Sequence, residues 1–420
     1  MKSILSLLTV LLLSTAAFAQ DNNESKFSIS SEIRPRYELR DGYKTIISEE
    51  EDAGQFISNR VRLNLDYSKG PLSMALKLQD VGIWGDRSAF INESTHKIGF
   101  FEAWAAYQLS TKLSLKAGRQ ILSYDDERIM GQVNWAQSGL SHDALVLQFK
   151  NAAGDIRMHL GASYNQTEEV NVKASYPYTN RSMQYLWLNR SNEKLRASFL
   201  FLNNGTQALE ADVKSNYSQT FGLFLNNTDN SNWDLGGSLY GQTGEDVSGK
   251  SISAFYVAAH AKKVLTENYK LGVGFEILSG TDMTESDGKN HSFDPIYGTN
   301  HKFNGYMDYF YVGNHKGNVG LQDYYAQFDY QKNKFSSSLA LHSFLAAADL
   351  SSDMDKYLGT EIDLTLNYKV DKDFSISAGY SHMFATDSLQ KLKTGTTSRS
   401  NANWAYISLA FTPQFFSFSK

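Results

Sequence analysis

Hydrophobic and polar residues alternate with a period of two along most of the chain. Between positions 358 and 369, the even positions carry Leu, Thr, Ile, Leu, Leu and Tyr, and the odd positions carry Gly, Glu, Asp, Thr, Asn and Lys. The same alternation recurs over 72–79, 156–165, 269–277 and 374–381. This pattern predicts β-strands with one apolar and one polar face. Strands this long exceed the roughly 5–6 residues usual in soluble sheets and suit the roughly 9–11 residues that cross a bilayer at a tilt.

Applied to the whole chain, the pattern predicts about 18 strands. They fall near 27–40, 56–67, 72–80, 98–109, 112–122, 141–149, 155–166, 183–189, 194–203, 216–226, 232–242, 251–262, 268–279, 321–331, 334–344, 357–370, 373–384 and 402–412. The links between them alternate in length. Short links at 68–70, 110–111, 151–154, 190–193, 332–333 and 371–372 separate long ones at 41–55, 81–97, 123–140, 167–182, 280–320 and 385–401.

Short turns on one side and long loops on the other are typical of outer-membrane β-barrels. The fold class that we predict is therefore all-β: a transmembrane antiparallel β-barrel of about 18 strands, with short periplasmic turns and long extracellular loops. An even number of strands returns both termini to the periplasm. A closed barrel also leaves no strand edge unpaired in lipid, where each unsatisfied backbone group costs several kcal/mol.

Aromatic residues gather at the strand ends that lie beside the short links. They are Phe27, Tyr67, Tyr107, Phe149, Trp233, Tyr269, Tyr330, Phe335, Tyr368 and Phe374. Aromatic side chains favour the lipid–water boundary, where they form girdles around barrels. We interpret this set as the periplasmic girdle.

The first residues have the features of a secretory signal peptide. Lys2 precedes an apolar run over 4–13, and small residues lead to Ala17-Phe18-Ala19. We expect cleavage after Ala19, so that residues 1–19 are the signal and residues 20–420 form a single barrel domain. Further along, the sequence has no run of about 18 apolar residues that could form a transmembrane helix. The expected location is the bacterial outer membrane.

Composition excludes several kinds of site. The chain has no cysteine, so it contains neither a disulfide nor a thiolate metal site. Its formal net charge of −5 gives no general attraction to nucleic acid. A mean hydropathy of −0.40 agrees with a barrel whose lumen and loops are polar. We expect no cofactor and no metal. The expected partners are a solute, the lipid of the outer membrane and the barrel-assembly machinery.

The alternation turns many charged residues of the first strands toward the lumen. If Ile33 and Tyr37 face lipid, then Glu32, Arg34, Arg36, Glu38 and Arg40 face inward. The second strand likewise turns Arg60 and Arg62 inward, and later strands add Lys77, Glu102 and Lys116. Inward arginines favour passage of anions, because a guanidinium replaces water around a carboxylate or phosphate. The alternative is that charges of both signs only make the lumen wettable.

Two positions break the alternation. Pro35 removes a ladder hydrogen bond in a barrel without edges, so we expect a bulge or bend there. Strict alternation also turns Arg119 toward lipid, at a cost of about 2–4 kcal/mol near the midplane. Either a bulge at Gly118 rotates Arg119 into the lumen, or Arg119 already lies at the outer interface.

The same region carries a resemblance to a known family. The run GRQ-x-LSYDDERIMG-x-VNW over 118–135, followed by His142-Asp143-Ala144, resembles the alginate-export family of outer-membrane porins. The segments ExRPRYE over 32–38 and NRVRL over 59–63 are similar to the family as well. So is FDPxYG over 293–298, with His301 and with GYMD over 305–308. The resemblance extends over nearly the whole mature chain.

The resemblance implies an 18-stranded barrel whose arginine-lined constriction passes an anionic polysaccharide. The matching positions near the constriction would be Arg60, Arg62, Arg119, Asp126 and Arg128. Together with the inward charges, they complete the candidate set for pore lining and anion selectivity: Arg34, Arg36, Arg60, Arg62, Lys77, Glu102, Arg119, Asp126 and Arg128.

Other constellations carry less weight. Asp282, Glu285, Asp287 and Asp294 lack the spacing of a calcium loop, and a solvated loop is the better interpretation. His260, His342 and His382 show no paired ligand spacing. Ser141-His142-Asp143 is contiguous, whereas catalytic triads are assembled from separated positions. No residues therefore suggest an enzyme.

We predict a passive channel for small or polymeric solutes, with anionic saccharides such as alginate-like uronates as the favoured cargo. The alternative is a plugged or glycan-binding barrel without an open channel. The aromatic-rich loop 280–320 would then be the plug or the glycan platform.

Overall fold

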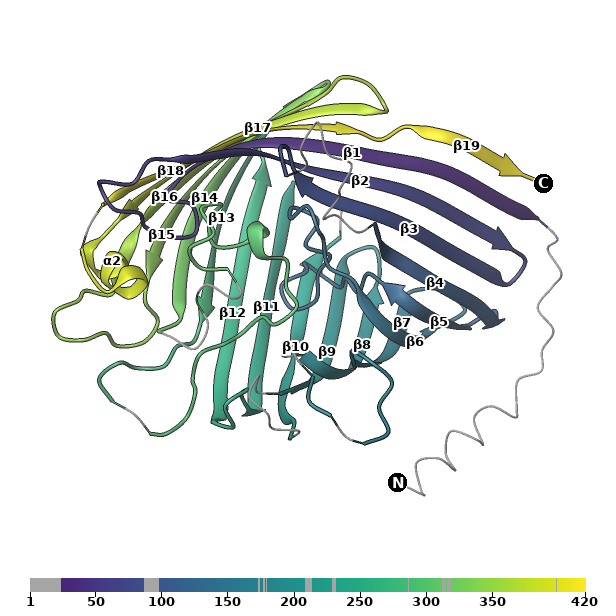
Figure 1. Cartoon of the computed structure of the whole chain (residues 1–420), viewed down its shortest axis with the longest axis horizontal. Helices are drawn as coiled ribbons and strands as arrows, with labels where there is room; N and C mark the ends of the chain where they lie inside the picture. Colours follow the sequence, from purple (N-terminus) through teal and green to yellow (C-terminus); the bar gives the residue numbers. More distant parts are fainter. Residues whose placement is uncertain are drawn as a thin grey trace.

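The computed structural model describes residues 24–86, 98–172, 174–176, 178, 180–207, 214–228, 232–285, 287–311, 315, 319–397 and 399–420. The expected signal peptide lies outside these residues. The described chain is a closed antiparallel barrel of 18 strands, as predicted (Figure 1). The last strand is divided at Thr412 and Pro413 into β18 and β19, and both parts pair with β1 to close the sheet. No helix of the described residues is long and apolar enough to cross a membrane.

Each strand pairs with its neighbours in the sequence. The strands are β1 (Ser25–Asp41), β2 (Gly54–Lys69), β3 (Leu72–Ile83), β4 (Gly99–Ser110), β5 (Leu113–Gln120), β6 (His142–Lys150), β7 (Ile156–Tyr164), β8 (Asn180–Ser191), β9 (Leu195–Thr206), β10 (Asn216–Asn227), β11 (Trp233–Glu245), β12 (Ser251–Val264), β13 (Tyr269–Leu278), β14 (Leu321–Lys332), β15 (Phe335–Leu345), β16 (Tyr357–Lys369), β17 (Phe374–Ala385), β18 (Asn401–Phe411) and β19 (Gln414–Ser419). Among the described residues, two short helices, η1 (Asn300–Lys302) and α2 (Asp387–Thr394), lie within long loops.

The two faces of the wall differ as the period-two pattern requires. On β16, Ile362 faces outward and is 36% exposed, whereas its neighbour Asp363 is 1% exposed. Aromatic rings at the turn side contact one another, and Phe374 stacks on Phe411 with ring centroids 4.5 Å apart. The outer face is thus apolar with aromatic contacts at the turn end, which suits lipid.

Neither Pro35, where we expected a bulge or a bend, nor Gly118, where a bulge was one of two alternatives, shifts the register. β1 pairs continuously with β2 through Pro35 and Asn59. On the other side of β1, Ile33 pairs with Phe411 of β18, and the next ladder pair is Arg36 with Ser408. Pro35, which has no N–H, lies in the gap between these two pairs. β5 pairs through Gly118 with both neighbours. Gly118 is needed because its φ is +116° and a Cβ would lie 2.3 Å from the Ala103 carbonyl oxygen.

The register shifts at other places in the described sheet instead, and two of these shifts bury an apolar side chain. Lys77 pairs with Glu102 and Leu78 pairs with Phe100, so Phe101 is the extra residue and is buried. Leu358 is likewise skipped in the β15–β16 register and is fully buried, although strict alternation predicts that it faces lipid. An extra residue in one strand turns its side chain to the other face.

Two long loops, 121–141 and 279–320, fold into the barrel. Figure 1 shows the segment with η1 inside the ring of strands. Three contacts hold it from different sides: Tyr297 Oη donates to Asn204 of β9 at 2.5 Å, the Met307 amide donates to Glu361 of β16 at 2.7 Å, and the Lys44 amide of the first loop donates to the Met307 carbonyl. Apolar residues of both loops join one buried cluster. The loops therefore narrow the lumen.

Candidate functional site

Three arginines of β1 and β2 hold the 121–141 loop against the wall. Arg34 donates to the carbonyl oxygens of residues 134–136 at 3.0 to 3.3 Å and to Gln137 Oε1 at 3.0 Å. Arg36 donates to the Trp135 carbonyl oxygen at 2.9 Å. Arg60 donates to the side-chain oxygen of Asn134 at 3.0 Å. Because a guanidinium presents several donors in one plane, these residues can satisfy a loop that has no ladder partner.

Glu32 lies at the centre of the arginine group. Its carboxylate is 2.5 Å from Arg60 Nη2, 3.8 Å from Arg62 Nη1 and 3.9 Å from Arg34 Nε. The Arg62 guanidinium lies over the bulged Phe101 ring, 3.6 Å from its centroid. One carboxylate thus faces three guanidinium groups, and an aromatic face covers one of them.

The neighbouring wall is more nearly balanced in charge. Lys77 Nζ is 2.5 Å from Glu102 Oε1, and Trp104 Nε1 donates to the same carboxylate at 2.9 Å. Lys116 Nζ lies 3.8 Å from the Trp104 ring centroid. On this wall, the Lys77–Glu102 pair joins opposite charges directly.

Arg128 joins the two inward loops to the opposite wall. It is 4% exposed, and its Nη2 lies 2.9 Å from Glu276 Oε2 of β13 and 2.7 Å from Asn304 Oδ1 of the 279–320 loop. Asn304 also donates to Asp323 of β14 at 3.2 Å. Asp126 accepts the Arg128 amide at 3.0 Å. Arg128 is therefore a buried anchor.

Aromatic rings meet where the two loops touch. Trp135 stacks on His301 with centroids 4.2 Å apart, and His301 stacks on Tyr306 at 4.8 Å. The edge of Trp404, from β18, packs against Trp135 at 5.6 Å. The stack spans from the wall to the 279–320 loop and forms a ledge within the lumen.

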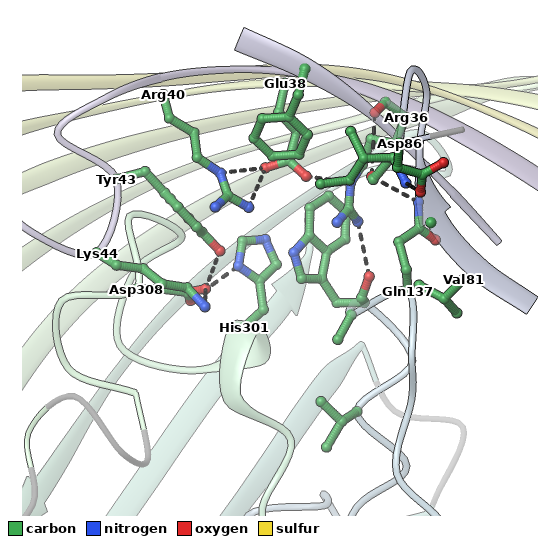
Figure 2. Close-up of a pocket in the computed structure, with 17 residues that line it drawn as sticks. Arg36, Glu38, Arg40, Tyr43, Lys44, Val81, Asp86, Gln137, His301 and Asp308 are labelled. Carbon is green, nitrogen blue, oxygen red and sulfur yellow. Dashed lines mark hydrogen bonds and ion pairs between the residues drawn. The ribbon is translucent and has the colours of Figure 1, made fainter. Parts of the chain in front are cut away.

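Asp308 ties this ledge to the first loop. Figure 2 shows His301 and Tyr43 both directed at its carboxylate. His301 Nδ1 lies 3.1 Å from Oδ1, and the Tyr43 hydroxyl donates to Oδ2. Burial disfavours the charged form of Asp308, but the charge and hydrogen bond of His301 and the hydrogen bond of Tyr43 outweigh it, so its pKa lies below its ordinary value. Burial raises the pKa of Tyr43, which remains the donor.

These residues border an outer pocket of about 600 Å³ between the loops and β1–β3 (Figure 2). Its accessible charge is mainly positive. The Arg40 and Lys44 side chains are 36% and 39% exposed, while the Glu38 and Asp308 side chains are only 1% and 4% exposed. Asp86 is the exposed carboxylate of the lining.

A second chamber of about 410 Å³ lies below the 279–320 loop against β9–β15. Its lining includes Asp125, Asp126, Asp234, Glu276 and Asp323 together with Arg196 and Lys302. Burial raises the pKa of Asp125 to about 6, although hydrogen bonds from Ser198 and Trp187 oppose this. The barrel thus holds an outer chamber with exposed cations and an inner chamber rich in carboxylates.

The candidate residues divide into three groups. Arg34, Arg36, Arg60, Arg62, Lys77 and Glu102 lie together on the inner wall of β1–β4. Asp126 and Arg128 lie in the 121–141 loop, toward the opposite wall. Arg119 does not line the lumen: without a bulge it stays on the outer face, where its side chain is 45% exposed and its Nη2 lies 3.7 Å from Asp143. It occupies the loop end of β5, which corresponds to the outer-interface alternative.

The sequence alternation did not single out the residues of the ledge. Trp135 and His301 lie in long loops, where period two gives no orientation, and Tyr43, Lys44 and Asp308 share no motif spacing. Trp135, His301 and Asp308 do fall inside the segments that resemble the alginate-export family, which is the signal that the sequence offers for them.

A family model described as alginate export matches residues 25–403. This match covers almost the entire barrel. The chain belongs to the alginate export family. No curated protein matches it.

Solved structures of similar shape support the same fold. The outer membrane protein OpdK of Pseudomonas aeruginosa has a TM-score of 0.62 at 11% identity, covering 94% of this chain and 99% of that one. OccK5 (OpdH) of the same organism has a TM-score of 0.63 at 12% identity, covering 93% and 98%. Acinetobacter baumannii OccAB4 has a TM-score of 0.62 at 12% identity, covering 94% and 100%.

The alginate export family and the barrel fold together identify an outer-membrane channel. The location agrees with the sequence prediction. The family to which the chain belongs is described by export, which is a transport function. The identity of the solute is a separate question, addressed by the chemistry of the two chambers.

Proposed function

We propose that this member of the alginate export family passes anionic saccharides, such as uronate chains, along the arginine-bearing wall of β1 and β2. The observation that carries the proposal is the outer pocket, where cations lie on aromatic faces. Arg40 lies 4.4 Å from the Tyr43 ring and 4.7 Å from the Phe56 ring, and Lys44 lies 4.3 Å from the Tyr311 ring.

This chemistry suits a carboxylated sugar. The guanidinium and ammonium groups bind carboxylates, and aromatic rings offer flat apolar surfaces to the C–H faces of a pyranose. The pocket volume of about 600 Å³ has room for one or two sugar units at a time. Burial lowers the pKa of Lys44 from its ordinary value of 10.5, while Asp308 opposes the shift.

The arginines would act in two ways in such a channel. Arg34 and Arg60 position the 121–141 loop and so set the width of the path. Arg36 and Arg62 lie on the same wall and, with Arg40, add positive potential. Lys77 and Glu102 neutralise each other and keep the wall wettable. Asp126 and Arg128 fix the far side of the constriction.

A plugged barrel is the second candidate, and the buried apolar cluster inside the barrel favours it. Met307 and Tyr309 of the 279–320 loop are fully buried there, so this loop occupies lumen space with a packed core. A plugged barrel would conduct no ions, whereas the proposed channel conducts along the wall of β1–β3.

The test is a planar bilayer measurement of reversal potential under a salt gradient. We expect the wild type to be anion-selective and Arg40→Gln/Lys44→Gln to shift the reversal potential toward cations. The matched control is Lys250→Gln/Lys289→Gln, which removes two charges outside the outer pocket and should leave selectivity unchanged. Cation selectivity in the wild type would overturn the proposal, and absence of any conductance would favour the plug.

A further inference from the structure

The β6–β7 hairpin places two cations directly opposite each other. Lys150 pairs with Arg157 in the antiparallel register, so both side chains emerge on the same face at neighbouring positions. Like charges in such a pair repel. Both residues lie at the turn end of their strands, which is the periplasmic end of the barrel.

The hairpin register shows which face they occupy. Gln148 pairs with His159 two positions further into the barrel, so His159 shares the face of Lys150 and Arg157. The His159 Nδ1 atom lies 3.0 Å from the Tyr124 hydroxyl of the 121–141 loop. Because that loop is inside the barrel, this face is the lumen.

A cavity of about 500 Å³ opens beside the pair. Its lining contains Lys112, Lys150, Arg157 and His159, and the described residues that line it include no carboxylate. Gln148 also borders it; its Oε1 accepts a hydrogen bond from the Ser114 hydroxyl at 3.3 Å, which leaves the NH₂ group as its donor toward a ligand.

Two other lysines of the lumen are each neutralised by a nearby carboxylate. Lys262 lies 2.8 Å from Asp329, and Lys77 lies 2.5 Å from Glu102. Within the described part of the chain, by contrast, no carboxylate lies within 4.0 Å of the charged groups of Lys112, Lys150 or Arg157. These three cations repel one another, and an anion that binds between them lowers that repulsion.

We propose that Lys112, Lys150 and Arg157 form a carboxylate-binding site at the periplasmic mouth, where an anionic saccharide is held before it enters the lumen. This inference rests on the proposed function and deepens it, because it assigns the first contact of a solute that arrives from the periplasm. His159 and Gln148 add hydrogen-bonding groups to the site.

The test measures current block by tetragalacturonate in bilayers of neutral phosphatidylcholine, so that no anionic headgroup competes. We expect Lys150→Gln/Arg157→Gln to lower the frequency of block about tenfold when the saccharide is added on the periplasmic side. Block from the extracellular side should not change. Maltotetraose, which carries no charge, should show no difference between the variant and the wild type.

The matched control is Lys369→Gln/Lys372→Gln, which removes two charges from the same end of the barrel at β16 and the turn that follows it. An equal loss of block in this control, or no loss in Lys150→Gln/Arg157→Gln, overturns the periplasmic site while leaving an anion-selective wild type intact. If the wild type itself is neither anion-selective nor blocked from either side, the proposed function fails as well. Heat-modifiable gel migration verifies that each variant is a folded barrel.

Discussion

Replacing Arg34 with lysine separates the two roles that an inward arginine can have. Lysine keeps the positive charge but loses the planar fork, and the Arg34 fork serves three successive carbonyls and one amide oxygen of the 121–141 loop. Hydrogen bonds from a charged donor contribute about 1.5–3 kcal/mol each. If a lysine retains half of the four hydrogen bonds that Arg34 makes, Arg34→Lys lowers the free energy of local loop opening by about 3 kcal/mol or more.

A loss of about 3 kcal/mol makes local opening about 100-fold more frequent. The amides that report it belong to the loop itself: the Leu140 amide donates to the Gln132 carbonyl, and the Gly131 amide donates to the Tyr297 carbonyl. Hydrogen exchange in detergent should therefore accelerate over residues 131–140. Arg119→Lys is the control, since Arg119 lies outside the lumen. Unchanged exchange in Arg34→Lys would refute the assignment of Arg34 as a clamp.

Three further predictions concern buried charges. Arg128→Met leaves Glu276 without its cation and should destabilise the barrel by about 3–5 kcal/mol, seen as a lower thermal unfolding temperature. Burial raises the pKa of Asp125 to about 6, so the folded barrel holds this proton more tightly than the unfolded chain, and the free energy of unfolding falls as the pH rises from about 4 through 6. Unfolding measured at pH 4 and pH 7 should show that Asp125→Asn lacks this part of the pH dependence, which amounts to up to about 3 kcal/mol. Burial lowers the pKa of Lys393 to about 7, so the unfolded chain binds this proton more tightly and the free energy of unfolding rises with pH above 7. Lys393→Met should lack this rise when unfolding is followed above pH 7. An identical pH profile in the variant and the wild type would contradict the burial of the Lys393 ammonium group.

The strands could be predicted because one side of the wall contacts lipid and the other contacts water. That difference imposes period two on every strand, and all 18 strands follow from it. The helix α2 could not be found in this way, because it lies in a loop where no membrane imposes a period. Its local signals are Thr386, whose side chain accepts the Leu389 amide, and Gly395, which ends it in the left-handed conformation.

The exceptions to the alternation were harder to locate. Pro35 and Gly118 drew attention as rule breakers, yet the ladders pass them without a bulge, because a missing ladder bond at Pro35 and a positive φ at Gly118 are sufficient. Phe101 and Leu358 fit the alternation and are nonetheless bulged. Both are buried against segments that come from elsewhere in the chain, and such tertiary packing leaves no trace in the local pattern.

The side chains that the inward arginines contact also depend on tertiary structure. Alternation turns Arg34, Arg36 and Arg60 inward, where the structure places them, but it cannot show that a loop 100 residues away in sequence returns to meet them. Alternation alone therefore predicts that they line an open lumen. In the structure most of their donors are already used by the loop.

Use of these donors by the loop does not remove the positive charge of the wall. A backbone carbonyl is neutral, so a guanidinium that donates to it keeps its full charge, whereas an ion pair with a carboxylate cancels it. On β1 and β2, the clustered arginines Arg34, Arg36, Arg40, Arg60 and Arg62 face the carboxylates of Glu32 and Glu38. One set of residues can therefore position the loop and also maintain a positive potential beside it. Comparing Arg34→Lys with Arg34→Gln tests this directly: both should loosen the loop, but only Arg34→Gln should reduce anion selectivity in the bilayer. If the two variants shift the reversal potential equally, the potential depends on the position of the loop and not on the charge of the wall.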